Sequence, residues 1–99
     1  MYLVVFRNRK RAGIDGAAYG ADAARMEQLA RSQPGFIDFK SFAADDGEVV
    51  AISTWADQES ARGWRQQGEH TAVQGRGRAD YYAEYELRAG PVERHHRFP

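Results

Sequence analysis

The sequence predicts an α+β fold, a ferredoxin-like antiparallel sheet with its helices packed on one face. Segments rich in β-branched and aromatic residues alternate with segments of helical periodicity, in the order strand, helix, strand, strand, helix, strand. Short turns with proline, glycine or aspartate separate these segments. The 99 residues are enough for a single domain, which we expect over residues 1–99, with about 90–99 as a C-terminal tail.

Each expected element has a local reason. Asp15 can cap the first helix, and the Pro34–Gly35 pair stops it, because proline disfavours helix at the preceding residue. Gly47 permits the hairpin turn that follows the second strand, and either Thr54 or Asp57 can cap the next helix. The expected strands are 2–9, 36–44, 48–55 and 81–89, and the expected helices are 15–33, about 57 to 68, and 69–76.

Both faces of the expected sheet are apolar. In the third strand Val50 and Ile52 point to one face, while Val49, Ala51 and Trp55 point to the other. Helices can cover only one face, and a large apolar patch is uncommon on a monomer. We therefore expect a homodimer in which two sheets pack face to face.

Composition excludes several classes of function. Fourteen basic and fourteen acidic residues give no net charge, which argues against nucleic acid as a partner. The basic cluster Arg7, Arg9, Lys10 and Arg11 is expected to be solvated or ion-paired. The absence of cysteine excludes thiolate chemistry and thiolate-bound metals, and His95–His96 is typical of a flexible tail rather than a metal site. The apolar N-terminus is too short to span a membrane, so we expect a cytoplasmic protein.

Five segments carry a resemblance to a known family, and the run of Trp55, Asp57, Glu59, Trp64, Glu69 and His70 is its most specific part. The segments are VVFRNR (4–9), YGADAARMEQLARSQPGF (19–36), DGEVVAISTWADQESARGW (46–64), GEHTAVQGRGRADYY (68–82) and VER (92–94). With them the chain resembles the antibiotic biosynthesis monooxygenase family, within the dimeric α+β barrel superfamily. The resemblance implies a homodimeric barrel with a pocket in each subunit, between the sheet and the helices. It also implies two chemistries: some members oxidise polycyclic phenols or quinols with molecular oxygen without metal or flavin, and others bind and degrade haem.

Three residues are the catalytic candidates. His70 is the one histidine outside the tail and suits a general base near neutral pH, although it could equally begin the helix at 69–76 as a structural residue. Trp64 could form one wall of a pocket or belong to the core. Asn8 is unusual in a strand, so it either orients a substrate oxygen or marks the end of the strand.

The expected substrate pocket comprises mostly aromatic residues. Alternation places Tyr81 and Tyr85 on one face of the last strand and Tyr82 on the other, where it could line the pocket. Tyr19, Met26 and Phe36 are expected to belong mainly to the core and secondarily to line the pocket. The expected pocket residues are Tyr19, Met26, Phe36 and Tyr82.

The leading functional hypothesis is a cofactor-independent monooxygenase that acts on a small aromatic phenol or quinol. Haem binding is one alternative, but Gln74 lies at or next to the position where the resemblance implies an iron-binding histidine, and glutamine is a poor iron ligand. A non-catalytic dimer that binds a small apolar ligand is the other alternative. No metal or other cofactor is expected under the leading hypothesis.

Overall fold

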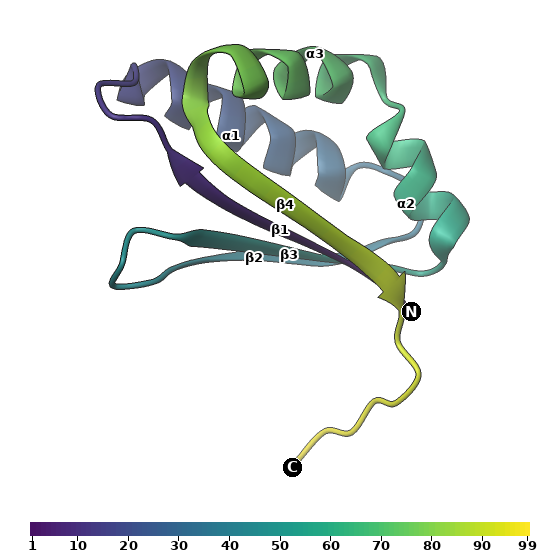
Figure 1. Cartoon of the computed structure of the whole chain (residues 1–99). Coiled ribbons are helices and arrows are strands. Elements are labelled where there is room, and N and C mark those ends of the chain that lie inside the picture. The colour runs from purple at the N-terminus through teal and green to yellow at the C-terminus, as the bar shows by residue number, and fades with distance from the viewer.

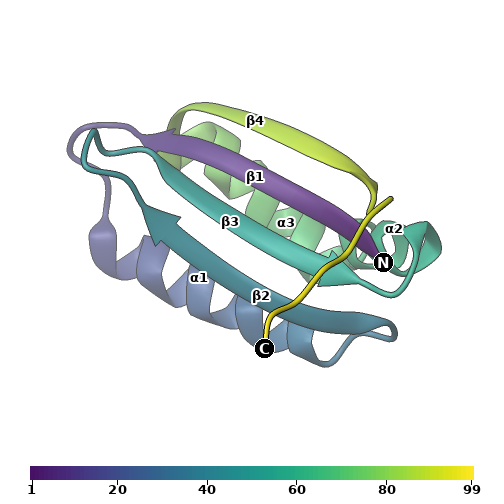
Figure 2. The same cartoon turned by 90° about the horizontal axis from the view of Figure 1, so that it is seen from below.

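The computed structural model describes residues 1–99, apart from the side chain of Glu69. Four antiparallel strands form one sheet in the order β2-β3-β1-β4. The helices lie on one side of it (Figure 1), and the view from below shows the other side of the sheet in front of them (Figure 2). The predicted ferredoxin-like α+β fold is confirmed. The elements in chain order are β1 (Tyr2–Lys10), α1 (Gly16–Arg31), β2 (Phe36–Ala43), β3 (Val49–Trp55), α2 (Gln58–Arg65), α3 (Gly68–Arg76), η1 (Gly77–Tyr81) and β4 (Tyr82–Pro91).

The predicted helix starts are present in the structure. The Asp15 carboxylate accepts a hydrogen bond from the Ala18 amide at 3.0 Å, and the Asp57 carboxylate accepts one from the Ser60 amide at 2.8 Å. Of the two candidate caps for α2, the structure therefore uses Asp57. That helix ends at Arg65, earlier than expected, because Gln67 then caps α3 by accepting from the His70 amide at 2.8 Å.

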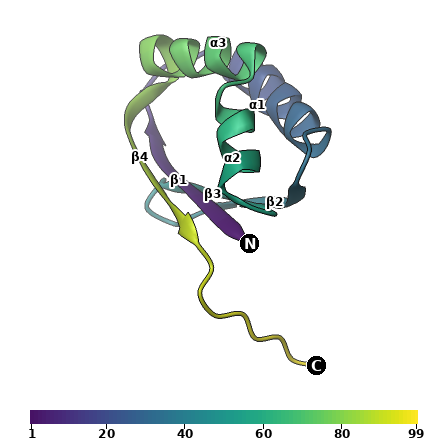
Figure 3. The same cartoon turned by 90° about the vertical axis from the view of Figure 1, so that its right-hand side faces the viewer.

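The core lies between the sheet and α1 and α2. Ala30, Trp55 and Ala61 are buried at its centre, and Trp55 is 0% exposed. Tyr2, Val4, Phe36 and Trp64 pack around them. α1 packs against β2, and α2 packs against β1 and β3. Strand β4 lies at the opposite edge of the sheet from β2, so helix packing is concentrated away from β4 (Figure 3). On β4, Tyr85 and Leu87 consequently remain 45% and 47% exposed.

The short η1 segment was not expected from the sequence. Five residues, Gly77–Tyr81, continue α3 with a wider turn before the chain enters β4 at Tyr82. The last strand therefore begins one residue later than predicted and extends to Pro91. Beyond it the tail leaves the sheet (Figures 1 and 3), after a hydrogen bond from the Val92 amide to the Met1 carbonyl at 2.9 Å. None of the described helices is long and apolar enough to cross a membrane.

Candidate functional site

Three aromatic side chains form a column between β3 and the start of α3. Trp55 in β3 and Trp64 in α2 lie nearly parallel, with ring centroids 6.2 Å apart. The His70 ring stacks on the other side of Trp64, with a centroid distance of 4.0 Å and an interplanar angle of 8°. The structure thus brings together two of the three catalytic candidates, Trp64 and His70, and ties them to the core through Trp55.

The hydrogen bond of His70 determines which ring nitrogen is free. Its Nδ1 lies 3.0 Å from the carbonyl oxygen of Trp64. A carbonyl can only accept, so the neutral ring carries its proton on Nδ1, and the lone pair of Nε2 remains available. Burial lowers the pKa of His70 below its ordinary value of 6.5, against the opposing effect of the Trp64 hydrogen bond. The ring is therefore a neutral proton acceptor at neutral pH.

The same residue also serves the start of α3, because its backbone amide donates to the Gln67 side chain. Both interpretations of His70, base and structural residue, are therefore compatible with its contacts. Gln74, the residue expected near the iron-ligand position of haem-degrading relatives, lies one helical turn further along α3 and is half-buried.

The third catalytic candidate, Asn8, belongs to a different cluster near the other end of β1. Asn8 is 3% exposed, and its Oδ1 accepts a hydrogen bond from the Lys10 ammonium. That ammonium lies 4.6 Å from the ring centroid of Tyr19 and 5.4 Å from that of Tyr82. The cation–π contacts join β1, α1 and β4 on the helix side of the sheet.

Lys10 departs from the expectation for the basic cluster. Arg7 pairs with Glu48 at 2.8 Å, and Arg9 pairs with Asp46 at 2.9 Å, as expected for solvated arginines. Because side chains alternate along β1, Lys10 points to the opposite face, where it contacts the rings of Tyr19 and Tyr82 instead of an acidic side chain. The expectation of a solvated or ion-paired side chain was wrong for this residue.

The prediction that Tyr82 and Tyr85 point to opposite faces was also wrong. Lys10 pairs with Tyr82 but Arg9 pairs with Glu84, so a bulge inserts one extra residue, Ala83, in β4. The bulge turns Tyr82 to the face of Tyr85, and both rings contact Phe6, at centroid distances of 5.4 and 5.5 Å. Burial and the adjacent Tyr19 raise the pKa of the Tyr82 hydroxyl, so it remains protonated at neutral pH.

The remaining expected pocket residues occupy separate places. Tyr19 contacts Tyr82 and Tyr81 edge-on, at 6.3 and 5.2 Å. Phe36 packs edge-on against Trp55 at 5.6 Å and belongs to the core. Met26 lies half-buried on α1, between the turns of Tyr19 and Ala30.

A polar clamp that sequence reasoning missed holds α1, α3 and η1 together beside this cluster. The Asp22 carboxylate accepts two hydrogen bonds from Arg76, both at 2.9 Å, and a third from the Tyr81 hydroxyl at 2.8 Å. The Arg76 guanidinium is the main cause of a lowered Asp22 pKa. The partners are more than fifty residues apart along the chain, so no local spacing indicated them.

Helix α3 runs from the Trp64–His70 pair to the cluster around Lys10. His70 lies in its first turn, while an added Cβ at Gly77, just beyond its last turn, would lie 2.6 Å from the Tyr82 ring. Seven residues of helix separate these positions by about 10 Å. Trp64 and His70 therefore mark one end of the helix side and the Lys10 cluster marks the other. No group of three metal-ligating side chains occurs among the described residues.

The sequence model of the antibiotic biosynthesis monooxygenase family matches residues 1–76, about three quarters of the chain. The chain belongs to this family. Family membership supports a monooxygenase in general and leaves the substrate open. Among curated relatives, the uncharacterised protein YqjZ of Bacillus subtilis is 35% identical over 97 residues, which cover 98% of this chain and 83% of YqjZ.

Solved structures of this antibiotic biosynthesis monooxygenase fold superpose over nearly the whole chain. SnoaB of Streptomyces nogalater, described as a cofactor-independent oxygenase, matches with a TM-score of 0.77 at 20% identity and covers 95% of this chain and 94% of its own. A protein of Deinococcus radiodurans with the same family description matches with a TM-score of 0.85 at 10% identity, over 100% of this chain and 99% of its own. At these identities the structural likeness establishes the fold.

Proposed function

We propose that the protein is a cofactor-independent monooxygenase that oxidises a small aromatic phenol or quinol with molecular oxygen. Membership of the antibiotic biosynthesis monooxygenase family supports the reaction class. The similarity to SnoaB, described as a cofactor-independent oxygenase, supports the absence of a cofactor. The observation that carries the proposal is the hydrogen bond between the His70 ring and the Trp64 carbonyl, because it leaves a neutral Nε2 as proton acceptor.

The chemistry begins with proton transfer. His70 Nε2 accepts the hydroxyl proton of the substrate, and the resulting phenolate is electron-rich enough to pass one electron to oxygen. Recombination of the two radicals gives a hydroperoxide on the ring. Loss of water then leaves a quinone, so one oxygen atom enters the product as a carbonyl and the other leaves as water. Because Trp55 and His70 lie over its two faces, Trp64 holds the orientation of the His70 ring and contributes its edge to the wall beside it.

Asn8 acts at a distance from this base. It lies in the Lys10 cluster, so we assign it the binding of a substrate oxygen remote from the hydroxyl that His70 deprotonates. The Tyr82 and Tyr19 rings form the adjacent wall, Met26 lies half-buried on α1, and Phe36 packs against Trp55 at the other end of the sheet. The separation of the two clusters favours substrates longer than a single ring.

Oxygen consumption with a panel of phenols and quinols tests this proposal. We expect His70→Gln to lower turnover about 10²- to 10⁴-fold, the usual contribution of a general base. His95→Gln, which changes an exposed histidine in the tail, is the matched control and should retain full turnover. Turnover undiminished in His70→Gln, with normal circular dichroism, would remove His70 from the mechanism.

Haem binding is the alternative that the family leaves open. The residue near the expected iron-ligand position is Gln74, a poor iron ligand, and the histidine of α3, His70, lies one helical turn earlier. These residues do not form the histidine ligand that haem degradation would need at that position. A haemin titration is the test, and the proposal predicts no shift of the Soret band at micromolar protein.

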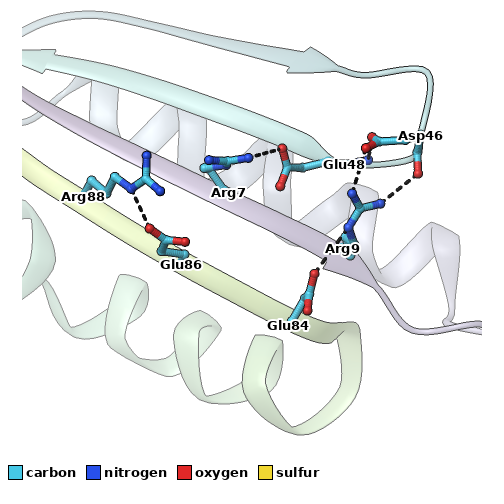
Figure 4. A network of polar contacts seen from close by, with 7 residues as sticks. All are labelled: Arg7, Arg9, Asp46, Glu48, Glu84, Glu86 and Arg88. Atoms are coloured by element: carbon cyan, nitrogen blue, oxygen red, sulfur yellow. Dashed lines mark hydrogen bonds and ion pairs between the residues drawn. The ribbon is translucent and has the colours of Figure 1, made fainter.

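We propose further that the protein is a homodimer through the open face of the sheet. Alternation and pairing place five apolar side chains there, Leu3, Val5, Phe42, Val50 and Ile52, and Phe42 is 48% exposed. Beside them lies the ion-paired network of Figure 4, in which Arg7 and Arg9 bridge β1 to Glu48, Asp46 and Glu84. An apolar patch with a charged border has the composition of a protein interface.

Molar mass from light scattering tests the dimer. Ile52→Lys places a charge in the centre of the patch and should shift the protein toward monomer. Gln28→Lys, on the exposed surface of α1, adds the same charge elsewhere and should leave the dimer unchanged. A wild-type protein that runs as a monomer at all concentrations would refute this assembly.

A further inference from the structure

Lys10 is a half-buried cation without an acidic partner among the side chains that the structure describes. Its neighbours in sequence are all engaged: Arg7 and Arg9 by carboxylates, and Arg11 by the backbone carbonyls of Arg78, Ala79 and Tyr82. The Lys10 ammonium has three donors and gives one to Asn8. A charge withdrawn from water without a counter-ion is unfavourable, and a bound anion would offset that penalty.

The bond from Lys10 also fixes the orientation of the Asn8 amide. Because an ammonium can only donate, the atom that it contacts is the amide oxygen, and the NH₂ group points elsewhere. That NH₂ group makes no hydrogen bond within the described part of the chain. Its two donors therefore lie close to the two unused donors of Lys10, in a group that can hold an anionic oxygen.

The surroundings of these donors are aromatic. Tyr82 lies beneath the ammonium, and Tyr85 contacts Tyr82 and Phe6 at centroid distances of 5.9 and 5.5 Å. Tyr85 is 45% exposed because helix packing is concentrated away from β4. A flat ring can stack on this exposed tyrosine while its polar group reaches Lys10.

We propose that Lys10 and Asn8 form an oxyanion-binding site, which takes the carboxylate or phenolate oxygen of an aromatic ligand whose ring lies on the exposed Tyr85. The site rests on the proposed function only where that ligand is identified as the substrate. In that case the anion anchors one end of the molecule while the base acts at the other. The binding site itself requires no turnover.

Calorimetric titration with two matched probes tests the site. We expect 2-naphthoate to bind the wild-type protein at least about tenfold more tightly than the neutral 2-naphthamide, since hydrogen bonds to a charged group stabilise more than neutral ones. Lys10→Met keeps the length of the side chain and removes its charge. It should weaken naphthoate binding about 10- to 100-fold and leave naphthamide binding unchanged.

Lys40 provides the control, because it is the other lysine of the chain and also lies over an aromatic ring, 5.4 Å from the centroid of Phe42. Lys40→Met should bind naphthoate like the wild type. Asn8→Asp supplies an internal carboxylate for Lys10 and should abolish the preference for the charged probe. Titration with 4-nitrophenol above and below its own pKa shows whether a phenolate is accepted as well as a carboxylate.

Two results would overturn the inference: equal affinity of the wild type for naphthoate and naphthamide, or equal losses in Lys10→Met and Lys40→Met. Reductive methylation gives a localised readout, in which bound naphthoate should protect Lys10 and not Lys40. None of these measurements involves oxygen. Failure of the proposed oxidation would leave them unchanged, and failure of the anion site would leave the His70 experiment unchanged.

Discussion

Two glycines of the same helical region should respond in opposite ways to the same substitution. Gly75 lies within α3, and a Cβ added there would meet no atom within 4 Å. Gly77 follows directly after α3, in helical backbone with φ −56° and ψ −49°, so alanine fits its dihedral angles equally well. A Cβ at Gly77 would lie 2.6 Å from Cε2 and 3.1 Å from Cδ2 of Tyr82.

The expected difference follows from these distances. Replacing either glycine by alanine gains about 0.5–1 kcal/mol, because glycine loses more conformational freedom on folding. At Gly77 the new methyl group approaches the ring about 1 Å closer than an ordinary carbon contact of about 3.5–4.0 Å. Tyr82 cannot withdraw freely, since Phe6, Tyr19 and Lys10 surround it. Overpacking of this kind costs about 1–3 kcal/mol.

Thermal and urea unfolding of the two variants measure the difference directly. Gly75→Ala should raise the melting temperature, and Gly77→Ala should melt at least about 4 °C below Gly75→Ala. In a Tyr82→Val background the ring is gone, and Gly77→Ala should become as favourable as Gly75→Ala. Equal stabilisation by both alanines in the Tyr82 protein would show that this ring does not lie against Gly77, and the geometry of the Lys10 cluster would then be wrong.

Three further substitutions test other parts of the structure. Asp22→Asn removes the charge that Arg76 and Tyr81 bind, and should destabilise the protein by about 1–2 kcal/mol at neutral pH. Because the Asp22 pKa is lowered from 3.8, its contribution is present above that value and is lost as the pH falls through the folded-state pKa, so melting curves of the two proteins should converge in acid. The lowered pKa of His70 makes the stability depend on pH: it should be full above about pH 6.5 and decline as the pH falls below that value, because the unfolded chain binds the proton first. In His70→Gln the melting temperature should depend less on pH in that range. Asp57→Ala removes the cap of α2 and should cost about 1 kcal/mol by urea unfolding, whereas Asp45→Ala in the exposed turn should have little effect.

The order of the elements could be predicted because it depends on local signals. Alternation identifies β1 and β3, and the cap at Asp15 locates the start of α1. For α2 the sequence left Thr54 or Asp57 as the cap, and the structure uses Asp57. The separation of Val50 and Ile52 from Trp55 onto opposite faces of β3 follows from the same alternation, and the strand register agrees with it. These properties involve residues a few positions apart, so a single sequence contains them.

The arrangement of the candidate site could be predicted only in part. The contact of Trp64 with His70 spans six residues, and the sequence indicated both as candidates. The face of Tyr82 was mispredicted because one extra residue in β4 reverses the alternation, and a bulge of this kind has no signal in the tyrosine spacing. Lys10 was grouped with the arginines on charge alone, although its position in β1 places it on the helix side.

The family match covers one part of the proposed site and ends before the other. Residues 1–76 contain Trp64 and His70, together with Asn8 and Lys10 on β1, whereas Tyr82 and Tyr85 lie beyond them. The proposed proton acceptor and the proposed oxyanion donors therefore lie within the matched residues, while the aromatic surface proposed to hold the ring lies on β4. An exposed edge strand can change its side chains with little effect on a core that lies under α1 and α2. Under the proposals made above, the choice of aromatic ligand is therefore better sought on β4 than in Trp64 and His70, which lie within the part of the chain that the family model matches.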